Sequence, residues 1–173
     1  MALSDMEIVQ LVTLLKKMEW PIDSRVFRVL CNKTVSVPIE LAVLNSRDEI
    51  LMFYRKDEEY DGYHIPGTVI RDTDSVQTAL QRLLQNEVIS GDEHISSPKY
   101  INWMEIPKGN DHGQNPTRHE ISLIYACWLN GPYKGKDGEF YPLDDLPENT
   151  LSHHRVLISE VQRWLSKNPW INN

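Results

Sequence analysis

The sequence predicts an α+β protein built on one main domain. Its 173 residues suffice for one domain with a sizeable core, but not for two comfortable ones. Several runs rich in Val, Ile and Leu have the length of strands, and other segments repeat apolar residues at helical spacing. Hydrophobic residues make up 40% and charged residues 25% of the chain, which is typical of globular proteins.

The first helix is predicted over about residues 5–18. Ser4 and Glu7 have the spacing of a capping box, and apolar residues then recur at helical intervals. Pro21 prevents continuation of this helix. We expect an N-terminal helical extension over residues 1–25, whose wide apolar face packs on the domain that follows or on a second copy of the chain, as a homodimer.

A single domain is predicted over residues 26–173, with its elements in the order strands, helix, strands, helix. Apolar and β-branched residues between turn signals predict the strands, and apolar residues at i, i+3 and i+4 predict the helices. The strands are expected over residues 34–44, 50–54, 99–106, 119–129 and 139–143, and the helices over residues 75–88 and 151–167.

Charge and composition limit the partners. The formal net charge is −7, and no basic stripe is present that would displace counterions from a nucleic-acid polymer. No apolar run approaches the length of a membrane span, and the first residues lack the order of a signal peptide. We therefore expect a cytoplasmic protein that acts on a small molecule, without a nucleic-acid or membrane partner.

The most informative segment covers residues 64–91. A short extended stretch ends in Pro66 and Gly67, a loop rich in Asp and Thr follows, and an amphipathic helix then carries Arg82 and Glu87. This arrangement resembles the Nudix box of the Nudix hydrolases, Gly-x5-Glu-x7-Arg-Glu-U-x-Glu-Glu-x-Gly-U, where U is aliphatic. The resemblance implies the Nudix-type α/β/α sandwich, with a mixed sheet between helices, preceded here by an extra N-terminal helix.

The aligned box departs from the family pattern at its acidic positions. Leu83 and Asn86 replace two of the glutamates, whereas Glu87 retains the third. Residues at i, i+3 and i+4 share one helix face, so this face keeps a single carboxylate. Because Mg²⁺ usually takes one or two carboxylates with waters and phosphates, we expect one Mg²⁺ or Mn²⁺ ion. The predicted metal site consists of Glu87, Asn86 and the backbone at Gly67.

The same departures resemble the GDP-mannose mannosyl hydrolase branch of the family, with Arg-Leu in place of Arg-Glu and one retained glutamate. In that branch one magnesium ion suffices, a histidine acts as the general base, and water attacks the sugar carbon instead of phosphorus. For this chain, the resemblance leaves both cleavage positions open.

Four residues are candidates for catalysis. Histidines are the natural bases at neutral pH where carboxylates are missing. His119 opens a long apolar strand, and His153 and His154 lie in the first turn of the last helix, whose dipole disfavours the imidazolium form. For Arg82, the resemblance implies that it steadies a glutamate of the catalytic face. All four also have an ordinary alternative as solvated surface side chains.

Four further residues are candidates for substrate contacts. Arg55 ends a predicted strand, where the family often has an arginine near the substrate. Thr68 lies where the family's loop backbone approaches metal and phosphate. Tyr60 and Tyr63 belong to an acidic, aromatic loop before the box and could stack on a base or sugar. Asp74, at the start of the box helix, is expected to cap that helix.

Two functions remain open from the sequence. The first is a Nudix-type hydrolase that cleaves a nucleoside diphosphate linked to another moiety, such as a nucleotide sugar. The second is a catalytically inactive module of the same fold, which binds a nucleotide or metabolite or serves as a protein-interaction surface. Loss of two of three carboxylates is compatible with either function, and we favour the hydrolase.

Overall fold

A computed structural model describes residues 2–90, 94–110 and 113–168 of the chain. The chain divides into two units, Met1–Thr34 and Val35–Asn173. This division falls after Thr34, later in the chain than the predicted boundary after residue 25. None of the described helices combines the length and the apolar character needed to cross a bilayer.

The first unit contains two helices. Helix α1 (Asp5–Leu15) begins with the predicted capping box, in which Ser4 Oγ accepts the backbone N–H of Glu7 at 3.4 Å and the Glu7 carboxylate accepts the N–H of Ser4 at 2.8 Å. Helix α2 (Ser24–Lys33) lies outside the predicted elements. Its N-cap is Asp23, whose carboxylate accepts a backbone N–H of the first turn at 3.0 Å. An Asp-Ser pair after a proline is a helix-start signal, so α2 is explained by local capping.

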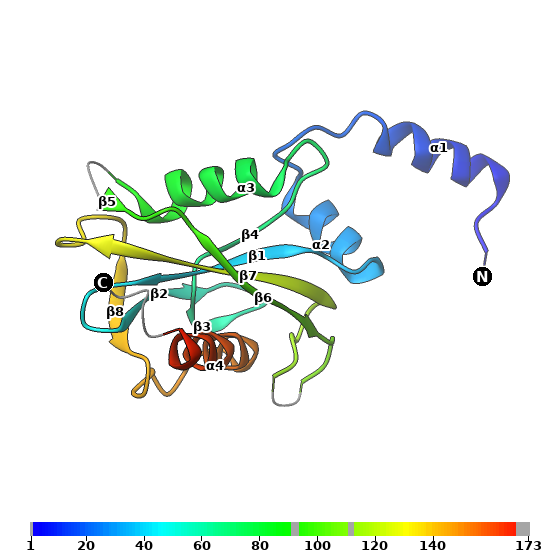
Figure 1. The fold of residues 1–173 in the computed structure, drawn as a ribbon. Helices are drawn as coiled ribbons and strands as arrows, with labels where there is room; N and C mark the ends of the chain where they lie inside the picture. The colour runs from blue at the N-terminus through cyan, green and yellow to red at the C-terminus, as the bar shows by residue number, and fades with distance from the viewer. Residues whose placement is uncertain (1, 91–93, 111–112, 169–173) are drawn as a thin grey trace. The chain divides into compact units, whose positions relative to one another are not determined.

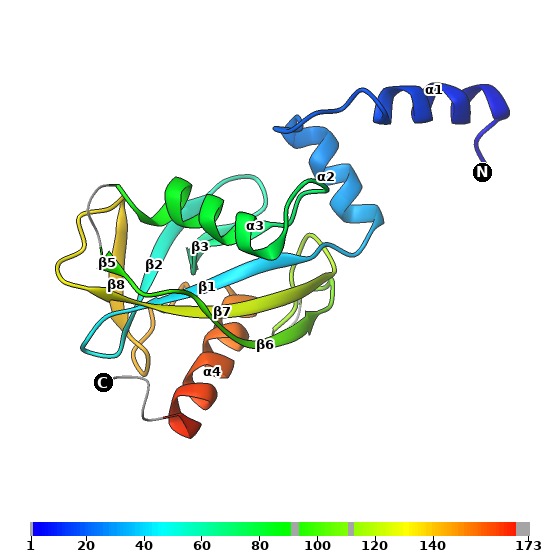
Figure 2. The ribbon, with the colours of Figure 1, turned by 45° about the horizontal axis from the view of Figure 1, so that its top comes forward.

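The described residues of the second unit form one mixed sheet, two α-helices and a π-helical turn. Its elements are β1 (Pro38–Leu44), β2 (Glu49–Lys56), β3 (Asp61–His64), β4 (Gly67–Val69), α3 (Val76–Leu83), η1 (Leu84–Val88), β5 (His94–Ile95), β6 (Lys99–Ile106), β7 (Glu120–Asn130), β8 (Gly138–Pro142) and α4 (Ser152–Lys167). Helices α3 and α4 lie on opposite faces of the sheet in both views (Figures 1 and 2). This layering confirms the predicted α+β fold with a mixed sheet between helices.

Strand β1 is central and changes its neighbour along its length. On one side it pairs in parallel with β7 throughout, from Ile39 to Leu44. On the other side it pairs with β4 as far as Glu40, and with β2 only at Leu44. On this side, the neighbour of β1 therefore changes from β4 to β2 in the middle of the strand, next to Glu40.

Two apolar clusters cover the two faces of the sheet. Successive side chains of a strand point to opposite faces, so Ile39 and Val43 pack with α3, whereas Ala42 and Leu44 pack with α4. Every residue of β1 is buried, as expected for a central strand covered on both faces. Glu40 has the phase of the α4 face and is the one charged residue of this buried strand.

The box helix is not continuous over the predicted residues 75–88. Helix α3 ends at Leu83, and η1 continues as a π-helical turn in which the N–H of Ile89 donates to the carbonyl of Leu84 at 2.8 Å. Such turns insert one residue into the helical spacing and are frequent at functional sites. Leu83 is 1% exposed and packs in the apolar cluster under α3, so its role lies in the core.

Candidate active site

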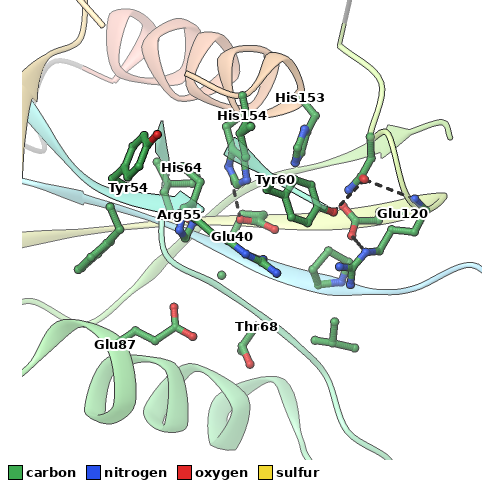
Figure 3. Close-up of a pocket in the computed structure, with 18 of the residues that line it drawn as sticks. Glu40, Tyr54, Arg55, Tyr60, His64, Thr68, Glu87, Glu120, His153 and His154 are labelled. Carbon is green, nitrogen blue, oxygen red and sulfur yellow. Dashed lines mark hydrogen bonds and ion pairs between the residues drawn. The ribbon is translucent and has the colours of Figure 1, made fainter. Parts of the chain in front are cut away.

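A pocket of about 470 Å³ lies beside the position where β1 changes its neighbour (Figure 3). Small-molecule sites commonly enclose about 300–1,000 Å³, so this pocket has the right size for a nucleotide. The box contributes one wall, which includes Thr68 and Glu87. The opposite wall comprises His153 and His154 from the start of α4 together with Glu40 of β1, which lies next to His154.

Most of the predicted site residues line this pocket, although they come from distant parts of the sequence. The predicted residues in the lining are Arg55, Tyr60, Gly67, Thr68, Asn86, Glu87, His153 and His154. The lining does not include Arg82, Tyr63 or His119. The structure therefore joins the box to the first turn of the last helix.

Two of the predicted residues outside the lining have other contacts. His119 Nε2 lies 2.9 Å from Glu105 Oε1, and both side chains are substantially exposed. Tyr63 packs its ring edge-on against Tyr54 and against Tyr141, with ring centroids 5.2 Å apart in each pair. These contacts place His119 beside Glu105 of β6 and Tyr63 against the core on the α4 side.

Arg82 holds the loop of the box. Its guanidinium donates to Thr68 Oγ1 at 2.6 Å and to the carbonyl of Val69 at 3.1 Å, and it forms an ion pair with Asp74. This ion pair lowers the pKa of the Asp74 carboxyl. The predicted capping role of Asp74 is wrong, because Ser75 is the N-cap of α3. Arg82 does not line the pocket itself, but it positions Thr68 and its charge lowers the pKa of Glu87.

Glu87 extends from η1 into the pocket. Burial raises the pKa of its carboxyl, and a hydrogen bond donated by the backbone N–H of Gly67 opposes that rise. The Lys136 ammonium, which donates to the carbonyl of Asn86, also lowers the pKa of Glu87. Glu87 is therefore a carboxylate fastened to the box loop, with cationic charge nearby.

Glu40 is a pocket residue outside the sequence predictions. It is 6% exposed, and its Oε2 atom has no hydrogen-bond partner. Burial and repulsion from Glu120 and Glu87 raise the pKa of Glu40 well above its usual value. The sequence signal for Glu40 is a glutamate in the middle of an apolar strand, over residues 38–44, where a charge needs a reason.

Three histidines gather at the α4 wall. The ring centroid of His154 lies 4.4 Å from that of His153 and 5.6 Å from that of His64. The Nδ1 atoms of His153 and His154 have no hydrogen-bond partner, and His154 Nδ1 lies 3.9 Å from Glu40 Oε2. Burial lowers the pKa of His153 to about 4 and that of His154 well below its usual value. Both rings are consequently neutral at physiological pH.

The end of strand β2 and the loop before β7 complete the pocket. The Arg55 guanidinium lies 4.5 Å from the centroid of the Tyr60 ring, and the Tyr60 hydroxyl donates to Asn115 Oδ1 at 3.0 Å. Arg118 Nε lies 3.5 Å from Glu120 Oε1. Since Tyr60 is only 6% exposed, it supports Arg55 at the pocket more than it presents its own surface.

The donor set suits one hard divalent cation. Glu87, Asn86 and Gly67 line the pocket, and carboxylate, amide and backbone carbonyl oxygens are the ligands that Mg²⁺ and Mn²⁺ prefer. Within the described part of the chain, no group of three or more His, Cys, Asp or Glu side chains could hold a metal ion. An ion here would need waters or substrate phosphates to complete its ligands. The unpartnered oxygen of Glu40 lies in the same pocket, and a bound cation would favour the ionised form of this carboxyl, whose pKa burial otherwise raises.

Comparison with known families identifies the class of this protein. The Nudix domain model matches residues 36–161, which is most of the chain. The chain therefore belongs to the Nudix hydrolase superfamily, as the box predicts.

Individual relatives are distant. The ADP-ribose pyrophosphatase of Methanocaldococcus jannaschii is 23% identical over 148 residues, which are 82% of this chain and 80% of that protein. A MutT Nudix hydrolase from Burkholderia pseudomallei has a TM-score of 0.58 at 18% identity, over 74% of this chain and 98% of its own. The Nudix domain of Shewanella oneidensis NrtR, complexed with ADP-ribose, has a TM-score of 0.58 at 13% identity, over 94% and 99%. At such identities the structural likeness shows the fold.

Proposed function

We propose that this protein hydrolyses nucleoside diphosphates linked to a further moiety, with ADP-ribose and nucleotide sugars as the substrate class. The observation that carries the proposal is the pocket itself, in which Glu87 and Thr68 of the box face Arg55 and the paired His153 and His154. The named activity of the Methanocaldococcus jannaschii relative supports the same class of substrate.

The cationic side chains of the pocket would bind the diphosphate. Arg55 and Lys136 both line the pocket, and either can pair with phosphate oxygens. Thr68, positioned by Arg82, offers a hydroxyl on the box wall. Glu87, Asn86 and the Gly67 carbonyl would hold one Mg²⁺ or Mn²⁺ ion, which when bound would neutralise phosphate charge and activate the bond that is cleaved.

The two neutral histidines would accept the proton of the attacking water. His153 and His154 each have an unpartnered Nδ1 atom, and both line the pocket opposite the box. Because burial keeps the rings neutral, each can act as a proton acceptor at neutral pH. His119, the third candidate from the sequence, pairs with Glu105 away from this pocket, so we assign the base to the α4 pair.

Water can attack at two positions, and the products tell them apart. Attack at phosphorus yields a nucleoside monophosphate and a sugar phosphate, whereas attack at the sugar carbon yields a nucleoside diphosphate and a free sugar. The first outcome corresponds to the usual Nudix cleavage. The second corresponds to the mannosyl hydrolase branch that the altered box resembles.

The test is turnover of a defined panel in water enriched in ¹⁸O. The purified protein would be incubated with Mg²⁺ or Mn²⁺ and with ADP-ribose, GDP-mannose, dinucleotides or nucleoside triphosphates, and the products identified by mass. An ¹⁸O atom in the phosphate group of a product marks attack at phosphorus. An unlabelled nucleoside diphosphate released together with free sugar marks attack at carbon, because the anomeric oxygen of the sugar exchanges with water and carries no information. Glu87→Gln is the matched control, since it removes one charge and keeps the shape.

The replacement of two box carboxylates supports a second function, that of a nucleotide-binding module without catalysis. Asn86 is neutral and Leu83 lies in the core, so neither supplies negative charge to a cation. This alternative predicts no turnover of any compound in the panel, together with ligand-induced melting shifts that Glu87→Gln leaves unchanged. Turnover that Glu87→Gln abolishes would exclude it.

The oligomeric state, the cellular location and the partners of the protein remain proposals. We propose a homodimer formed through α1, a cytoplasmic location, and no nucleic-acid or membrane partner. Light scattering during size exclusion would measure the mass of the full chain and of a variant with Leu11→Glu and Leu15→Glu in α1. A dimeric parent with a monomeric variant would support the contact, and two monomers would refute it.

A further inference from the structure

We propose that Glu40 is a second carboxylate ligand of the divalent cation, so that strand β1 supplies the negative charge that the box helix lacks. The inference rests on the proposed function, because it concerns the same pocket and the same cation.

The contacts of Gly67 bring Glu40 and Glu87 to one place. Glu40 and Gly67 are register partners where β1 pairs with β4. A Cβ atom at position 67 would lie 2.5 Å from Glu40 Oε2, so the carboxylate occupies the space that the glycine leaves. The N–H of the same glycine donates to Glu87. Two carboxylates therefore converge on Gly67, one from β1 and one from η1. Figure 3 shows the side chains of Glu40 and Glu87.

One oxygen of Glu40 lacks the partner that a buried carboxylate normally has. Glu40 is 6% exposed, and its Oε2 atom accepts no hydrogen bond. His154 Nδ1 lies 3.9 Å from this oxygen, which is too long for a direct hydrogen bond. Burial disfavours the ionised form of a carboxyl unless its charge is paired or bound to a metal ion, and a divalent cation between Glu40 and Glu87 would stabilise both groups as carboxylates.

Glu120 is a second buried acid of the same pocket, and the protein itself supplies its hydrogen bonds and its counter-charge. It is also 6% exposed, but Arg118 lies 3.5 Å away, and Asn115 and Ser36 donate hydrogen bonds to it. The negative charge of Glu120 is thus balanced by the Arg118 guanidinium, without a metal ion. The difference leaves Glu40 as the buried pocket acid that is available as a ligand.

The two carboxylates also account for the altered box. Leu83 is in the core and Asn86 is neutral, so the helix alone offers the cation a single negative charge, from Glu87. With Glu40 the count becomes two, which is within the one or two carboxylates that usually bind Mg²⁺. The chain would then hold one ion with protein carboxylates on two sides and leave its remaining positions to water and phosphate.

The test measures binding of Mn²⁺ alone, without substrate. Electron paramagnetic resonance of free Mn²⁺ would give the dissociation constant for the parent, Glu40→Gln, Glu87→Gln and Glu120→Gln. We expect Glu40→Gln and Glu87→Gln each to weaken binding about tenfold or more, on the scale of lost metal-site contacts. Glu120→Gln removes an equal charge from the same pocket but should change the constant by less than about threefold.

A second variant keeps the test decisive if Glu40→Gln does not fold. Gly67→Ala leaves all charges in place but forces the Glu40 carboxylate aside, which is tolerable because the carboxylate ends a flexible side chain. It should also weaken Mn²⁺ binding. Equal effects of Glu40→Gln and Glu120→Gln, unchanged binding in Glu40→Gln, or no binding by the parent would overturn the inference. Binding that depends on Glu40 without turnover of any nucleotide would leave the inference intact and refute the hydrolase.

Discussion

The two walls of the pocket differ in where their charge comes from. The box wall consists of a loop and a helix end, and it carries one carboxylate, Glu87, within hydrogen-bonding distance of backbone. The opposite wall consists of buried strand and helix positions that carry Glu40, Glu120 and neutral histidines. The box wall is recognisable from a local motif, whereas the opposite wall is assembled from β1, β7 and α4.

This difference shows that the acidic groups of a site cannot be counted from an altered sequence motif alone. Judged by the box alone, the pocket has lost most of its negative charge. The opposite wall carries further acidic groups, at positions that do not belong to the box pattern. Burial raises the pKa of one of them, Glu40. Each prediction below tests whether one wall can work without the other.

The largest effect is expected for the box carboxylate. Glu87→Gln should lower kcat about a hundredfold or more, because the lost charge would hold the cation that activates the substrate. Steady-state kinetics at saturating Mg²⁺ would measure it, with the melting temperature as a control for folding. A variant with the parent's kcat would mean that the box wall contributes no catalysis.

The next effect concerns the base on the α4 wall. His153→Asn and His154→Asn should lower kcat, and the one that removes the base should do so by about a hundredfold. His94→Asn is the control, because His94 is exposed on β5. If the double variant His153→Asn/His154→Asn kept the parent's rate, the proton acceptor would have to come from elsewhere.

The pH dependence of stability should report on the same wall. Burial first, and then the charges of Arg118, His64 and Arg55, lower the pKa of His153 to about 4 from 6.5. The unfolded chain therefore binds a proton between pH 6.5 and 4 that the folded protein does not, and the free energy of unfolding falls as the pH falls through this window. The loss from His153 would be about 3 kcal/mol at most.

Urea unfolding at pH 7 and at pH 4.5 would measure this loss. His153→Gln should reduce the difference between the two pH values, since glutamine does not titrate. An unchanged difference would show that His153 is solvated in the folded protein.

A smaller effect is expected from the ion pair behind the box wall. Arg82 and Asp74 have side chains that are 18% and 12% exposed, and Arg82 also holds Thr68. Arg82→Ala should destabilise the protein by about 2 kcal/mol, as is typical for hydrogen bonds to charged groups. A double-mutant cycle with Asp74→Asn should give a coupling energy of about 1 kcal/mol or more. Additive effects would mean that the pair is not coupled.

The smallest effect is expected when a family carboxylate is restored. Asn86 lines the pocket, so Asn86→Glu should tighten Mn²⁺ binding by a few fold, about the effect of one further ligand charge in a partly solvated site. Leu83→Glu is the contrasting variant, because it would bury a charge in the apolar cluster and destabilise the fold. Unchanged Mn²⁺ affinity in Asn86→Glu would place the cation away from η1.

The sequence by itself determined the class of the protein and most of its elements. Strand β6 has the predicted limits, and β7 and α4 agree within one residue at each end, because apolar periodicity and turn residues are local properties. The capping box of α1 was likewise decided by neighbours along the chain. The Nudix box is a continuous segment, and this is why Gly67, Asn86 and Glu87 could be assigned to one site.

Only the tertiary structure decided which residues form the opposite wall of the pocket. The register of β1 with β4 places Glu40 opposite Gly67, and the packing of α4 on the sheet brings His154 close to Glu40. Neither contact can be predicted from the spacing of residues along the chain. The same long-range packing places His119 beside Glu105 and away from the pocket. Local hydrogen bonds and apolar periodicity are encoded in adjacent residues, whereas strand register and burial arise only when distant segments pack together.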